Sequence, residues 1–195
     1  MKKNAIRMVA ALGAFSASGI AVAHTGSHEV SGFFSGITHP LMGLDHLAVI
    51  LAVGLWLGVS ARRQAPLLMS VFLAVMAMGA AAGAAGLALP GIETGIAASL
   101  LMAGLLVASL ARLPMHASLV LVAAFALFNG AAHGSEMPVS ATPLLYGAGM
   151  LLSTALLQLA GIGLGQLAQR VRAEWLLRGA GIVGGGFGAW LLLGA

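Results

Sequence analysis

The chain has 195 residues, of which 60% are hydrophobic and only 7% are charged, and its mean hydropathy is +1.03. A soluble domain carries roughly 25% charged residues, so this composition excludes a water-soluble globular protein and indicates a membrane protein. The formal charge of +4 falls to +1 without the three basic residues near the N-terminus, so we expect no nucleic-acid partner. The absence of cysteine excludes disulfides and thiolate metal sites.

Residues 1–23 have the three parts of a secretory signal peptide. A basic start is followed by an apolar stretch and by the small-residue cleavage site Ala21-Val22-Ala23. An uncleaved first helix is the alternative. We expect cleavage before His24, a periplasmic N-terminal segment over residues 24–38, and a transmembrane domain over residues 39–195.

Apolar runs long enough to cross a bilayer recur along the rest of the chain. They predict an all-α, polytopic transmembrane bundle of about six helices, near residues 40–60, 66–89, 92–111, 115–134, 142–169 and 174–194. The connections are short, so we expect consecutive helices to be antiparallel neighbours. Glycines four residues apart, such as Gly54 with Gly58 and Gly79 with Gly83, predict helix backbones that approach closely.

The basic residues beyond the leader all fall near alternate links between the predicted helices. They are Arg62, Arg63, Arg112, Arg170, Arg172 and Arg178. Because short cytoplasmic loops are enriched in basic residues, these links should be cytoplasmic and both mature termini periplasmic. The expected location is therefore the inner membrane of a bacterium.

Two polar clusters interrupt the apolar runs, and the predicted topology places both at the periplasmic face. The first, residues 38–46, contains His39, Asp45 and His46, and the second, residues 129–138, contains His133 and Glu136. Ionisable groups at membrane depth are costly and mark functional sites. Two clusters that combine histidine with a carboxylate predict a cation site between them.

Helical spacing refines the first cluster. Pro40 suits the first position of a helix, which makes His39 a cap, and Met42, Asp45 and His46 can share one helix face. His39 and His46 would be about 10 Å apart along a regular helix. They can therefore bind one ion only if the helix is distorted, which Gly43 could permit.

Asn129, His133 and Glu136 form a single stripe at the end of the predicted fourth helix. Imidazole, carboxylate and amide ligands without thiolate favour a borderline divalent transition metal. A capping or packing role is the alternative for each histidine, and Asp45 could serve only to orient a neighbouring imidazole. Core or rim packing is the alternative for Met42.

The segment 39–46, His-Pro-Leu-Met-Gly-Leu-Asp-His, resembles the HPxxGxDH signature of the HupE/UreJ family, and residues 132–138 resemble that family's second motif. These small membrane proteins are associated with hydrogenases and ureases and are regarded as nickel or cobalt permeases. The resemblance implies a metal site of His39, Asp45, His46, His133 and Glu136. Asn129 departs from the histidine expected in many relatives, and amide oxygen is a weaker ligand.

We therefore expect a permease, not an enzyme, that carries Ni²⁺, with Co²⁺ as the second candidate, for hydrogenase or urease maturation. His24 and His28, near the mature N-terminus, are candidates for collecting the ion. The alternatives are a b-type haem membrane protein, a non-transporting metal-binding subunit and, as the weakest, an intramembrane hydrolase.

Overall fold

The computed structural model describes residues 28–87 and 89–194, and for residues 28–31 it describes the backbone only. The predicted leader and His24 therefore lie outside the described residues. Seven helices make up this part, and it contains no strand. They are α2 (His28–Met42), α3 (Leu44–Val59), α4 (Ala65–Ala84), α5 (Ile92–Ser109), α6 (Met115–Ser135), α7 (Pro143–Arg170) and α8 (Glu174–Gly194).

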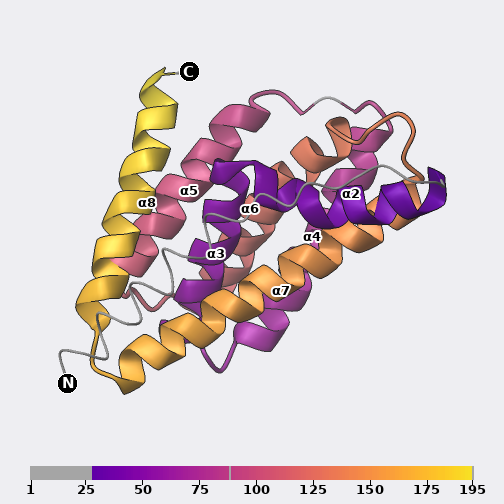
Figure 1. Cartoon of the computed structure of the whole chain (residues 1–195). Coiled ribbons are helices and arrows are strands. Elements are labelled where there is room, and N and C mark those ends of the chain that lie inside the picture. Colours follow the sequence, from indigo (N-terminus) through magenta and orange to yellow (C-terminus); the bar gives the residue numbers. More distant parts are fainter. Residues whose placement is uncertain (1–27, 88, 195) are drawn as a thin grey trace.

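Five of these helices, α4 to α8, are long and apolar enough to cross a membrane. The pair α2 and α3 makes a sixth span if the two are counted together, although their axes are bent by 81°. Figure 1 shows α2 lying across the bundle while α3 runs within it. The expected polytopic helical bundle is confirmed, but the segment expected to precede the first span, residues 24–38, contains most of an additional helix.

The bundle is assembled from three closely packed helix pairs, α3 with α7, α4 with α6, and α5 with α8. None of these pairs is consecutive in the chain, so the closest packing is not between the consecutive helices that were expected to be antiparallel neighbours. Glycines make the close approaches: a Cβ on Gly58 would collide with the backbone carbonyl of Ile162 in α7, and one on Gly83 with that of Ala131 in α6. The close packing expected at these glycines is confirmed.

Side chains tie the helices together at the end of the bundle where α3, α5 and α7 finish. The indole of Trp56 donates to the carbonyl of Ala111 at 2.8 Å, and the amide of Gln169 donates to the carbonyl of Val59 at 3.3 Å. The loops here carry most of the arginines named above, so we call this the arginine end. The opposite end, where α2 meets α3 and α6 finishes, is the histidine end.

Candidate metal centre

A sharp break between α2 and α3 builds one side of the centre. Gly43 separates the two helices and has an extended backbone, with φ −89° and ψ 111°. Pro40 lies inside α2 and His39 lies in its last turn. The expectation that Pro40 begins a helix capped by His39 is therefore wrong, because α2 extends the helix backwards to residue 28.

The break brings together two histidines that a regular helix would keep apart. The ring of His133, from α6, lies between them, with its centroid 4.9 Å from that of His39 and 4.5 Å from that of His46. The distortion at Gly43 that a shared site requires is thus present. The three rings, which come from α2, α3 and α6, define what we call the histidine cluster.

A carboxylate completes the outer side of the histidine cluster. Glu136 follows the last residue of α6 and its Oε2 lies 2.9 Å from Nε2 of His39. His39, His133 and Glu136 each offer one ligand atom, and these atoms all lie within 4.8 Å of one another. A cation placed among them could be held by two imidazole nitrogens and one carboxylate oxygen, which is a ligand set for a borderline divalent metal.

A second carboxylate orients His46. Oδ1 of Asp45 lies 3.0 Å from Nδ1 of His46 and accepts the backbone N–H of the same residue at 2.9 Å. An ionised carboxylate can only accept hydrogen bonds, so Nδ1 carries the proton and Nε2 keeps its lone pair. Nε2 of His46 is buried and has no hydrogen-bond partner within the described residues. Asp45 thus acts on the position and tautomer of the imidazole.

The innermost ring is buried with its polar atoms unpaired. His133 is 1% exposed, and neither of its nitrogens has a partner within the described residues. Leaving a polar group unpaired in an apolar interior costs about 2–7 kcal/mol. A bound cation would supply the missing partner, so this burial fits a ligand better than a packing residue.

Tyr146 of α7 contacts two members of the histidine cluster. Its hydroxyl donates to the backbone carbonyl of His133 at 3.1 Å, and its ring centroid lies 5.7 Å from that of His39. Sequence reasoning did not select this residue. The available signal was weak: it is the single tyrosine of the chain, one turn into a predicted helix, and tyrosine is common near membrane interfaces.

The other candidate ligands predicted from the sequence are not part of the histidine cluster. Met42 ends α2 and is 80% exposed, and the break at Gly43 removes the continuous helix face it was expected to share with Asp45 and His46. Asn129 is fully buried one turn below His133, and its amide donates to the carbonyl of Phe125 at 2.8 Å. His28 begins α2, but its side chain lies outside the described part of the structure.

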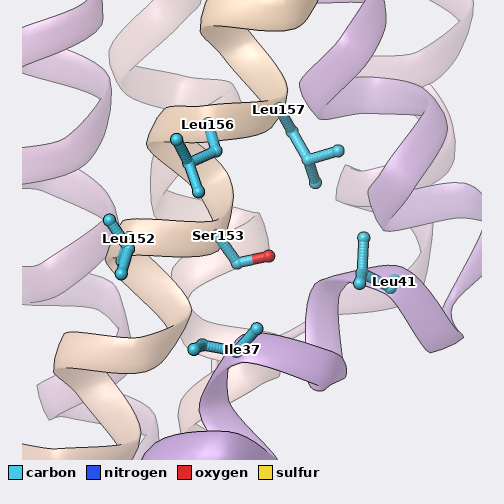
Figure 2. Close-up of a pocket in the computed structure, with 6 residues that line it drawn as sticks. All are labelled: Ile37, Leu41, Leu152, Ser153, Leu156 and Leu157. Atoms are coloured by element: carbon cyan, nitrogen blue, oxygen red, sulfur yellow. The ribbon is translucent and has the colours of Figure 1, made fainter.

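An apolar pocket of about 260 Å³ lies between α2 and α7, and no residue of the histidine cluster lines it. Figure 2 shows the residues that line it, Ile37, Leu41, Leu152, Ser153, Leu156 and Leu157. The hydroxyl of Ser153 is the single polar group among these side chains. Such a lining offers too few polar atoms to hold a cation.

Comparison with known proteins places these residues in a recognised sequence family. The model of the family described as "HupE / UreJ protein" matches residues 11–191. The protein named HupE of Rhizobium leguminosarum bv. viciae is 37% identical over 188 residues, which cover 96% of this chain and 98% of that protein. No solved structure matches the chain.

Proposed function

The chain belongs to the HupE/UreJ family, and on this premise we propose that it is a permease for a divalent transition metal, with Ni²⁺ as the first substrate and Co²⁺ as the second. This family consists of accessory, permease-like proteins, not enzymes. The metal delivered would serve the assembly of hydrogenase or urease metallocentres.

The observation that carries the proposal is the buried histidine cluster at one end of a bundle of membrane-spanning helices. Exposure falls from Glu136, whose side chain is 47% exposed, through His39 at 24% to His133 at 1%. An ion could therefore enter at the carboxylate and be transferred to the buried imidazoles. His46, held by Asp45 beside His133, would be the third imidazole available to the ion.

Charge supports an orientation for this path. The arginine end should face the cytoplasm, because basic residues concentrate in cytoplasmic loops. The histidine end and both mature termini would then be periplasmic, in the inner membrane of a bacterium. His24 and His28 would lie on the same side as the cluster, where they could collect the ion.

The same geometry disfavours the haem alternative. A haem held by two histidines lies between their rings, and the centroids of His46 and His133 are only 4.5 Å apart. That separation leaves no room for a porphyrin. A subunit that binds metal without transporting it would need the same cluster, so only a flux measurement separates it from a permease.

The test is uptake of radioactive Ni²⁺ by cells that express the wild-type chain, His46→Ala or His133→Gln. We expect both variants to lose most of the uptake above background, because each removes an imidazole from the buried cluster. His116→Ala is the matched control, since His116 is an exposed histidine at the opposite end of α6.

Membrane abundance of each variant would be measured by immunoblot alongside uptake. Equal uptake by wild type and both cluster variants would overturn the proposed site. Wild-type protein that binds Ni²⁺ but produces no flux in liposomes would instead identify a non-transporting metal-binding subunit.

A further inference from the structure

Three polar side chains are completely buried between the histidine cluster and the middle of the bundle. Asn129 of α6 and Thr154 and Gln158 of α7 are each 0% exposed. Oδ1 of Asn129, Oγ1 of Thr154 and both polar atoms of the Gln158 amide have no hydrogen-bond partner within the described residues. Such groups are rare in a membrane interior because each unpaired one is costly.

Two other buried hydroxyls in the bundle are satisfied by nearby backbone carbonyls. Ser99 donates to the carbonyl of Gly95 at 2.6 Å, and Ser118 donates to that of Pro114 at 3.2 Å. Thr154 makes no such bond, although a helical threonine commonly does so. Oγ of Ser60 and Oε1 of Gln64, at the two ends of the loop between α3 and α4, are also buried and unpaired. Within the described helices, the unpaired buried side-chain atoms outside the histidine cluster belong to Asn129, Thr154 and Gln158.

The two residues of α7 lie on a stripe that starts at the histidine cluster. Tyr146, Met150, Thr154 and Gln158 follow one another at four-residue intervals. All four are at most 2% exposed, so this face of α7 points into the bundle. Tyr146 bonds the backbone of His133, which places the outer end of the stripe at the cluster.

Helix geometry converts these intervals into distances along the helix axes. Four residues of helix advance about 6 Å, so Asn129 lies about 6 Å along α6 from His133, and Thr154 and Gln158 lie about 12 and 18 Å along α7 from Tyr146. The hydrocarbon core is about 30 Å thick. Since the backbone of Gln158 packs against Gly54 in the middle of α3, the unpaired atoms extend from the cluster into the central part of the membrane.

We propose that Asn129, Thr154 and Gln158 form an inner, oxygen-lined path that receives the divalent cation from the histidine cluster and leads it toward the arginine end. This inference rests on the proposed transport function and adds residues to it. Amide and hydroxyl oxygens bind a borderline metal more weakly than imidazole does. A path of weak sites suits conduction, because an ion must be able to leave each site as well as enter it.

The experiment measures Ni²⁺ influx into liposomes containing purified wild-type protein, Thr154→Val or Gln158→Met, together with equilibrium Ni²⁺ binding to the same preparations. Both substitutions nearly conserve volume and remove the polar atoms. We expect influx to fall roughly tenfold, the effect of losing one weak interaction, while Ni²⁺ affinity at the histidine cluster stays within about twofold of wild type.

Two further variants distinguish a role of these side chains in conducting the ion from a role in packing the helices. Ser153→Ala, one residue away and facing the apolar pocket of Figure 2, removes a hydroxyl outside the stripe and should conduct as wild type. Thr154→Ser restores a hydroxyl and should recover most of the influx.

Wild-type influx in both Thr154→Val and Gln158→Met would overturn the inner path and leave the proposed permease intact. Loss of Ni²⁺ binding together with influx, or failure of Thr154→Ser to recover, would also overturn it, because the side chains would then support the fold. Absence of influx through the wild-type protein would instead refute the permease itself.

Discussion

Gly43 offers a sharp test of how the centre is organised, because its replacement should act only through its neighbours. The backbone there is extended, with φ −89°, and alanine adopts this conformation without strain. A Cβ at this position would lie 3.0 Å from Nδ1 of His46 and 3.1 Å from Oδ1 of Asp45. It would therefore press directly on the hydrogen bond that orients the imidazole.

The expected loss of Ni²⁺ affinity in Gly43→Ala follows from these distances. Ordinary contacts of a Cβ begin near 3.4 Å, so one partner must retreat by a few tenths of an ångström. The Asp45–His46 bond, already 3.0 Å long, would then exceed the usual hydrogen-bond range. Loss of a group that orients a metal-binding histidine lowers affinity about 10–100-fold, which corresponds to about 1.4–2.8 kcal/mol.

The assay is a titration of detergent-purified Gly43→Ala with Ni²⁺ by calorimetry. Gly147→Ala is the matched control, because Gly147 is a helical glycine of α7 at which an added Cβ would meet nothing within 4 Å. In an Asp45→Ala background the effect of Gly43→Ala should shrink, since the bond it disturbs is already absent. Wild-type affinity of Gly43→Ala, or an undiminished effect in that background, would refute this account.

Three other perturbations follow from the structure. Tyr146→Phe removes the bond to the His133 carbonyl, and we expect thermal unfolding of the purified protein to report a loss of about 1 kcal/mol; an unchanged midpoint would show that the bond contributes nothing. Gly58→Leu should drive α3 away from α7 and reduce the protein recovered from membranes, whereas Gly163→Leu, at an exposed position of α7 where a Cβ meets nothing, should not. Because protons and metal compete for imidazole nitrogens, Ni²⁺ binding should weaken from about pH 7.5 to about pH 5.5; equal affinity at both values would argue against histidine ligands.

The membrane-spanning elements could be predicted closely because each depends on local composition. Helices α5 to α8 begin within one residue of their expected starts at 92, 115, 142 and 174. The boundary of the first span could not be predicted in the same way. Because proline is a frequent first residue of helices, the sequence predicts that a helix begins at Pro40, whereas α2 begins at His28 and contains Pro40. The actual break is at Gly43, three residues later.

In the candidate site, too, the spacing within one helix could be predicted from the sequence, but contacts between distant segments could not. Of the three residues predicted to form one stripe, Asn129 and His133 are both buried on α6, whereas Glu136 lies just beyond its end and is 47% exposed. The spacing could not indicate that Glu136 would contact His39 from a segment 97 residues earlier in the chain. That contact depends on the angle between α2 and α3, which is 81°. The spacing of residues within one helix carries no information about this angle.

The sequence did not predict which helices pack against each other, and the proposed function depends on that pairing. Close glycine spacings occur on most of the helices, so they identify faces suited to packing without identifying partners. In the structure α2 and α3 both pack along α7, with Gly36 against the backbone of Tyr146 and Gly54 against that of Gln158. One continuous face of α7 is therefore presented first to the histidine cluster and then to the centre of the bundle. Had consecutive helices paired instead, the stripe of α7 would have had no fixed relation to α3, and the inner path would have no outer site to receive an ion from.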